Sequence, residues 1–171
     1  MSGSDSMDRG VWAMALATKD GPQRQMAREK LVAMGREATP VLLQLLDDSE
    51  PKVRWEAALG LKALADPASV EGLVKALKDE NRDVRWVAAE GLAAIGEASM
   101  RPMLETLRQD ADSFALRDSA HVAISLLQDR ELRELLEPVY SAMKDGRSPE
   151  VVLMAAAEAL EALEGRDPLV A

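Results

Sequence analysis

The sequence of 171 residues has no cysteine and a single histidine. Without cysteine the chain has no disulfide, no thiolate nucleophile and no thiolate metal ligand, which is typical of a reducing compartment. A zinc site needs three or four protein ligands, and a nucleophile needs a base and an orienting group. We therefore expect a protein that is not an enzyme and that binds no metal and no cofactor.

Aromatic residues are also scarce, at 3% of the chain, whereas apolar residues make up 47%. Alanine and leucine favour helices, and the residues that favour strands are few, so the composition predicts an all-α protein. No apolar run approaches the ~20 residues that a membrane-spanning helix needs, and the polar residues 1–7 lack the apolar core of a signal peptide. We expect a soluble, cytoplasmic protein that does not contact membranes.

Positive charge is in deficit, with 21 Lys and Arg against 30 Asp and Glu and a net charge of −9. Because affinity for nucleic-acid phosphates depends on clustered Lys and Arg, we expect no duplex nucleic acid as a partner. The glycines are scattered singly and form no phosphate-binding loop. Carboxylate pairs are common at this acidity, and without metal ligands beside them they indicate solvated helix faces and cap charges.

The sequence does contain a repeat. Residues Val53–Leu61 read VRWEAALGL and recur 31 positions later as VRWVAAEGL, with seven of nine positions identical. A period of this length is typical of stacked helical repeats, in which each unit is too small to bury its own apolar face. Looser copies before and after this pair predict about five repeats in one domain over residues 8–165, between a disordered leader (1–7) and a C-terminal tail (166–171).

Each repeat is expected to contain a long and a short helix, which gives about eleven helices in all. The apolar spacing and the Gly and Pro positions predict helices over residues 8–18, 23–34, 41–46, 52–65, 83–95, 100–107 and 151–163. A helix boundary near Glu137 and Pro138 stays open. We expect Thr39 to cap the helix that begins at Pro40, and Pro102 to lie in a first helical turn.

The long helices have a core face and an opposite face. At about 100° per residue, one face of the 52–65 helix collects Val53, Ala57, Gly60, Leu61 and Leu64, and the other collects Trp55, Leu59 and Lys62. Small residues recur at matching positions: Ala57, Ala88, Ala120, Ala156, Gly60 and Gly91. Glycine in a helix interior costs ~1 kcal/mol relative to alanine, so its recurrence indicates a steric need, with chance as the alternative.

The pattern L-x-x-x-L-x-D-x-x-x-x-V-R-x-x-A-A over Leu73–Ala89 resembles the HEAT-like repeats of the phycobilin-lyase type. The resemblance implies a right-handed α-solenoid in which aspartate and arginine form a ladder between helices and repeats. A guanidinium can donate two hydrogen bonds to one carboxylate and so connect successive loops. The positions that match this structural ladder are Asp48, Asp79 and Asp110 with Arg54, Arg85 and Arg117, and Arg24 matches the arginine alone.

The side of the long helices opposite the core is the candidate partner-binding ridge, which in this family is concave. Trp55 and Trp86 should lie there side by side, about 10 Å apart as packed helices are. Exposed tryptophan is enriched at binding hot spots, although each indole could instead cover the adjacent repeat. The other expected ridge residues are Gln25, Glu29, Leu59, Glu90, Asp118, Val122, Met154 and Glu158. His121 takes the place of Ala58 and Ala89, which indicates a satisfied polar contact between repeats.

We therefore expect a non-enzymatic scaffold that binds a protein or peptide on its concave ridge. A basic or Arg-rich partner would suit the tryptophans and the acidic surroundings through cation–π and carboxylate contacts. Two other functions stay open. The resemblance implies a lyase-like or chaperone-like role on a chromophore, and the apolar helix over residues 151–163 suits a structural subunit that stacks at an uncapped end.

Overall fold

The computed structural model describes residues 3–144 and 148–166, and this part of the chain contains helices and no strand. The α-helices are α1 (Gly3–Leu16), α2 (Gly21–Ala33), α3 (Thr39–Leu45), α4 (Pro51–Leu64), α5 (Val70–Ala76), α6 (Arg82–Ile95), α7 (Glu97–Gln109), α8 (Phe114–Ser125), α9 (Arg130–Leu135), α10 (Glu137–Lys144) and α11 (Pro149–Glu164). Two 3-10 helices, η1 (Gly35–Ala38) and η2 (Pro67–Ser69), precede α3 and α5. The predicted all-α solenoid is confirmed.

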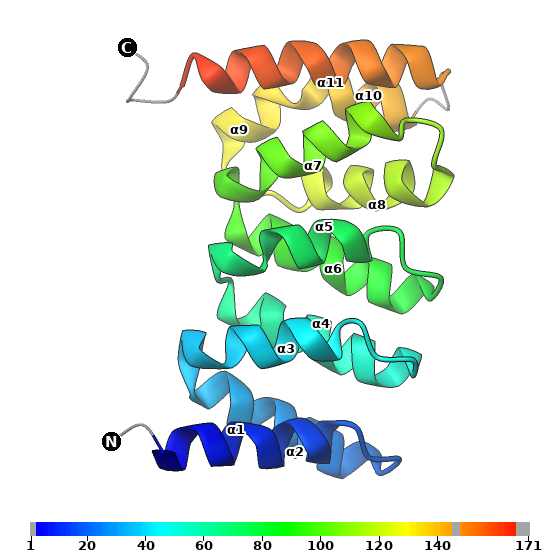
Figure 1. The fold of residues 1–171 in the computed structure, drawn as a ribbon. Helices are drawn as coiled ribbons and strands as arrows, with labels where there is room; N and C mark the ends of the chain where they lie inside the picture. The colour runs from blue at the N-terminus through cyan, green and yellow to red at the C-terminus, as the bar shows by residue number, and fades with distance from the viewer. Residues whose placement is uncertain (1–2, 145–147, 167–171) are drawn as a thin grey trace.

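The helices form two layers that run the length of the molecule (Figure 1). One layer contains α1, α3, α5 and α7, and the other contains α2, α4, α6 and α8, with α4 and α6 in the most extensive contact. The predicted core face of α4 lies between the layers, where Val53, Ala57, Gly60 and Leu61 are buried. One continuous core cluster extends from Leu16 to Leu163, so each repeat is buried by its neighbours.

Glycines within this stack allow close helix contacts. A Cβ atom on Gly60 would lie 3.0 Å from two methyl groups of Leu42, and one on Gly91 would lie 3.1 Å from a methyl group of Leu73. These distances support the steric explanation of the recurring glycines. The tightest contact is at Gly72 in α5, where a Cβ atom would overlap the end of Leu43, and the sequence repeat did not reveal it.

Several helix boundaries differ from those expected. Helix α1 begins at Gly3 rather than at residue 8. Thr39 is not an N-cap, because η1 leads directly into α3. The Thr39 hydroxyl group instead donates a hydrogen bond to Asp66 Oδ2 at 2.7 Å. Pro102 is not in a first turn either, because α7 already begins at Glu97, directly after Gly96. Residues 1–2 and 167–171 of the expected leader and tail lie outside the described residues.

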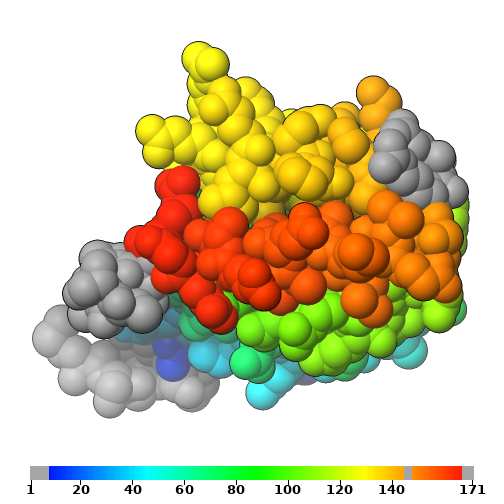
Figure 2. Space-filling view, turned by 90° about the horizontal axis from the view of Figure 1, so that it is seen from above, coloured from blue at the N-terminus to red at the C-terminus, as the bar shows by residue number. Residues whose placement is uncertain are grey.

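The last helices change layers, which corrects the expected ridge. Helix α10 packs against α8, so α11 packs against α7 and α10 instead of continuing the layer of long helices. Figure 2 looks down on this end and shows α11 (orange to red) between the yellow α9 and α10 and the green α7. Met154 and Glu158 on α11 are therefore not ridge residues, because the break at Glu137 creates a short helix that occupies the place beside α8.

The turn after each of the first three long helices requires a positive φ angle. Gly35 has φ 69°, Ala65 has φ 45° and Gly96 has φ 79°, so alanine occupies in one repeat the position that glycine has in the other two. An L-residue in this region is strained by about 1–2 kcal/mol.

We predict that Ala65→Gly raises the free energy of unfolding by about 0.5–1 kcal/mol, because the strain that it relieves exceeds the added entropy of the unfolded chain. Urea denaturation of the two proteins measures the difference. Ala63→Gly, at an exposed position inside α4, is the control and should lower stability by about 1 kcal/mol. Equal losses in both variants would contradict the prediction.

Candidate functional site

Trp55 and Trp86 lie on the adjacent helices α4 and α6 and keep 36% and 48% of their surface exposed. Each indole is thus partly packed and partly open to solvent, so neither of the two expectations for these residues holds alone. The sequence of the long helix produces this arrangement, because Val53 and Ala57 on either side of Trp55 turn into the core and leave the indole on the opposite face.

A small groove adjoins each tryptophan. The groove at Trp55 has a volume of about 340 Å³ and is lined by Arg24, Pro51, Lys52, Asn81 and Asp83. The groove at Trp86 has a volume of about 100 Å³ and is lined by Arg82, Arg85, Asp118, Ser119 and Val122. Both grooves include residues of the following long helix, so the surface exists only where repeats are stacked.

The structure places the other predicted ridge residues as follows. Asp118 and Val122 adjoin Trp86 as expected. Leu59 is partly buried in the core, and Glu90 forms an ion pair with Lys62 Nζ at 2.8 Å. Gln25 and Glu29 are exposed on α2 and bond to each other, with Gln25 Nε2 donating to Glu29 Oε1 at 3.0 Å.

Phe114, the first residue of α8, is 75% exposed and was not among the predicted ridge residues. It occupies the helix position that Arg82 has in α6, two residues before the buried apolar residue of the repeat. Phe114 is the one phenylalanine of the chain, and its position three residues before Arg117 could have identified it as the counterpart of Arg82.

The repeated arginines share a contact within their own repeat. Each donates an Nη1 hydrogen bond to the backbone oxygen six residues earlier: Arg24 to Thr18 (2.9 Å), Arg54 to Asp48 (2.9 Å), Arg85 to Asp79 (2.8 Å), Arg117 to Ala111 and Arg133 to Leu127 (3.3 Å). Arg133 was not among the predicted arginines, although a Leu-Arg pair marks both it and Arg117. The arginine therefore ties the loop before a helix to that helix.

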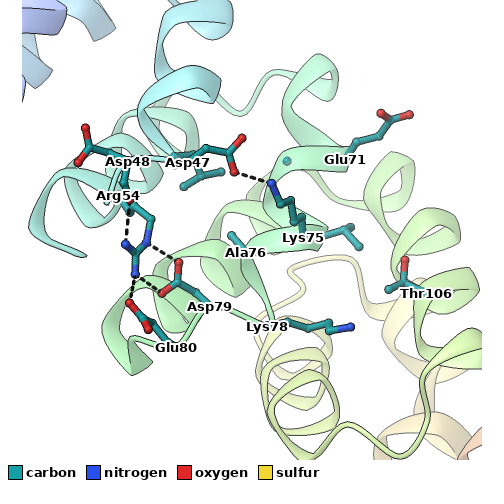
Figure 3. Close-up of a pocket in the computed structure, with 13 residues that line it drawn as sticks. Asp47, Asp48, Arg54, Glu71, Lys75, Ala76, Lys78, Asp79, Glu80 and Thr106 are labelled. Atoms are coloured by element: carbon teal, nitrogen blue, oxygen red, sulfur yellow. Dashed lines mark hydrogen bonds and ion pairs between the residues drawn. The ribbon is translucent and has the colours of Figure 1, made fainter. Parts of the chain in front are cut away.

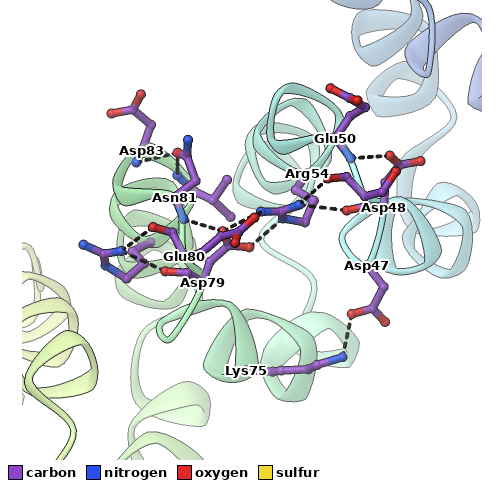
Figure 4. Close-up of polar contacts among 12 residues, drawn as sticks. Asp47, Asp48, Glu50, Arg54, Lys75, Asp79, Glu80, Asn81 and Asp83 are labelled. Atoms are coloured by element: carbon purple, nitrogen blue, oxygen red, sulfur yellow. Dashed lines mark hydrogen bonds and ion pairs between the residues drawn. The ribbon is translucent and has the colours of Figure 1, made fainter.

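The aspartate contact between repeats occurs at Arg54 (Figure 4). Its Nε donates to Asp79 Oδ2 at 2.7 Å, and its Nη2 donates to Asp79 Oδ1 at 2.9 Å and to Glu80 Oε1 at 3.1 Å. The bidentate bond to Asp79 raises the pKa of the buried Arg54 further above its usual value. Asp110 instead pairs with Lys78, so the ladder implied by the resemblance is not continuous.

The model for HEAT repeats matches residues 39–125, just over half of the 171 residues. The chain belongs to the HEAT-repeat family. Comparison with curated proteins gives no significant match. The match is to HEAT repeats in general and does not support the phycobilin-lyase type.

A buried ion pair joins the first two long helices of the HEAT array. Arg28 Nη1 in α2 lies 2.5 Å from Glu56 Oε2 in α4, and the Glu56 side chain is only 5% exposed. In the next two long helices the corresponding positions are Ala58 and Val87, both buried. The same place between HEAT repeats is therefore filled by an ion pair in one case and by apolar residues in the next.

We predict that Arg28→Ala lowers the free energy of unfolding by about 3 kcal/mol, because the Glu56 carboxylate is left buried without its partner. Arg28→Ala combined with Glu56→Val copies the next pair of repeats and should recover most of this loss. Urea denaturation of wild type, both single variants and the double variant measures the coupling. A double variant as unstable as Arg28→Ala would contradict it.

His121 lies between HEAT repeats and stacks on Tyr140 of α10, with ring centroids 4.2 Å apart and an interplanar angle of 17°. Its Nε2 is buried and has no hydrogen-bond partner within the described part of the chain. The contact between repeats was predicted, but the expectation that it is satisfied as a polar contact is wrong, because the ring stacks instead. Burial lowers the pKa of His121, and Lys144 adds to this, while Asp118 opposes it.

We predict that acid destabilises the fold partly through His121. In the unfolded chain histidine binds a proton near pH 6.5, whereas the folded pKa is lower. The stability that depends on neutral His121 is therefore fully present above about pH 6.5, and it is lost as the pH falls below that value. His121→Phe keeps the stacking and should lose less stability than wild type between pH 7 and pH 5, as urea denaturation at each pH measures. An unchanged pH dependence would contradict this.

Another groove, of about 670 Å³, lies along α5 and the loop that follows α3 (Figure 3). Several of its charged side chains are already paired with each other, with Lys75 Nζ 2.5 Å from Asp47 Oδ1 and Arg54 bonded to Asp79. Among the described residues, no three His, Cys, Asp or Glu side chains are placed to bind a metal, and no described helix is long and apolar enough to cross a membrane. The ridge is thus the stronger candidate site.

Proposed function

We propose that this HEAT-repeat protein is a non-enzymatic scaffold that binds a protein or peptide segment across Trp55 and Trp86. HEAT repeats generally mediate contacts between proteins. The observation that carries the proposal is the pair of half-exposed indoles, each beside a groove between two repeats. Tryptophan combines a large apolar surface with low conformational entropy, which makes it a frequent anchor of protein interfaces.

The ridge is also suited to a peptide by its shape. The two grooves meet at the start of α6, where Asn81 and Asp83 line one and Arg82 lines the other. An extended chain laid across α4 and α6 would contact both indoles, since packed helices lie about 10 Å apart and three extended residues span that distance.

We predict that Trp55→Ala/Trp86→Ala abolishes partner capture but leaves the protein folded. A half-buried indole contributes less than the 3–5 kcal/mol typical of a fully buried one, so we expect a loss of about 1–2 kcal/mol for each substitution. Quantitative affinity capture from the native cell extract, together with circular dichroism melting curves, measures both effects.

Leu153→Ala/Met154→Ala is the matched control, because both side chains are exposed apolar residues on α11 and lie off the ridge. This variant should capture the same partners as wild type. Loss of folding in the tryptophan variant would assign the indoles to the core, and unchanged capture would show that the partner binds elsewhere.

The other expectations have less support. No observation on the described residues favours a chromophore-handling role over protein binding. The cytoplasmic location and the absence of enzymatic activity stay predictions. A basic partner would suit Asp83 and Asp118 in the grooves, but it would also meet the cations that line them.

A further inference from the structure

The surroundings of the two tryptophans are more positive than negative, although the chain as a whole carries a net charge of −9. The grooves are lined by two carboxylates, Asp83 and Asp118, and by four cations, Arg24, Lys52, Arg82 and Arg85. Within the described ranges, none of these four cations forms an ion pair with a carboxylate. Fixed positive charge is therefore concentrated beside the exposed indoles.

Local charge decides which partner the grooves favour. At physiological ionic strength the Debye length is about 8 Å, so exposed charges beyond that distance are largely screened. A side chain docked against Trp55 or Trp86 experiences the groove residues far more than the remote carboxylates that make the whole chain acidic. The helices α4 and α6 also begin at these grooves, and helix N-termini favour negative charge.

The arginines in the grooves differ from the arginine between them. Arg54 bonds its carbonyl partner and also a carboxylate, with both Nε and Nη2 donating to Asp79. Arg24 and Arg85 make the same carbonyl contact, but the Nε of each is buried and has no hydrogen-bond partner in the part of the chain that the structure describes. Neither guanidinium therefore contacts a carboxylate of the described residues as Arg54 does, and the partly exposed remainder of each side chain lines its groove.

We infer that the ridge binds an acidic, extended segment of a partner protein, with carboxylates beside Arg24 and Arg85 and apolar side chains against Trp55 and Trp86. This inference rests on the proposed function and names the chemistry of the partner, which is opposite in charge to the basic partner expected from the sequence. Helices α2 and α6 are two helix spacings apart, or about 20 Å. The two carboxylates would thus be about six residues apart in an extended chain.

A selection from a random displayed nine-residue peptide library against the full chain tests this inference. We expect the retained peptides to be enriched in Asp and Glu and depleted in Lys and Arg. A labelled retained peptide should bind about tenfold more weakly when its Glu residues are changed to Gln, because charge-assisted hydrogen bonds are lost. Binding should also weaken by about tenfold in Lys52→Glu/Arg82→Glu, where both side chains are exposed and the fold is not at risk.

Arg108→Glu/Arg130→Glu is the matched control, because it makes the same change in net charge at exposed positions outside the grooves. It should leave the affinity unchanged. Arg85→Lys keeps the positive charge and a donor for the backbone carbonyl but removes the paired donors of the guanidinium group. It should weaken the binding of acidic peptides more than Arg117→Lys does. Fluorescence polarisation measures all of these affinities.

The outcomes separate the two proposals. Retained peptides that need both tryptophans but are basic or uncharged overturn the acidic assignment and leave the proposed function in place. The same conclusion follows if Lys52→Glu/Arg82→Glu binds acidic peptides as tightly as wild type. Retained peptides that bind Trp55→Ala/Trp86→Ala equally well, or no retained peptide at all, overturn both.

Discussion

Burial of each repeat against the next is the constraint on which the rest of this structure depends. The short helices cannot cover the apolar face of a long helix by themselves, and the core becomes continuous only when α2, α4, α6 and α8 stack. Close stacking in turn requires small residues at the contact, as Gly60, Gly91 and Gly72 show by the leucine methyl groups that lie against them. Only the helix faces that are not buried between repeats are then available to bind a partner.

The position between successive long helices has a fixed geometry but variable chemistry. It contains the Arg28–Glu56 ion pair in the first interface and apolar residues in the next. Near the C-terminal end, His121 of α8 instead stacks on Tyr140 of the short helix α10. Packing tolerates the exchange between the first two interfaces because Ala58 and Val87 stand at the positions equivalent to Arg28 and Glu56. The polar pairs depend on their partners, since either charge alone would be buried without compensation.

The five repeated arginines share one structural contact but differ in their contacts with carboxylates. All five close the loop before their own helix, whereas Arg54 also holds a carboxylate of the following repeat. Arg24 and Arg85 make no carboxylate contact within the described part of the chain, and each lines a groove beside a partly exposed indole. The same residue type is thus structural in the middle of the array and available to a partner on either side.

The sequence by itself determined the all-α class, the stacked repeats and the core face of the long helices, because helical periodicity and a 31-residue period can be read from the chain alone. It left open whether Trp55 and Trp86 are exposed or packed against the next repeat. It could not place α11, whose apolar pattern fits either layer, and so it assigned Met154 and Glu158 to the ridge. It also could not show that Arg85 lacks the contact that Arg54 makes, or that cations surround the indoles. Only the tertiary structure decided these points, because they depend on which loops and helices lie next to each other in space.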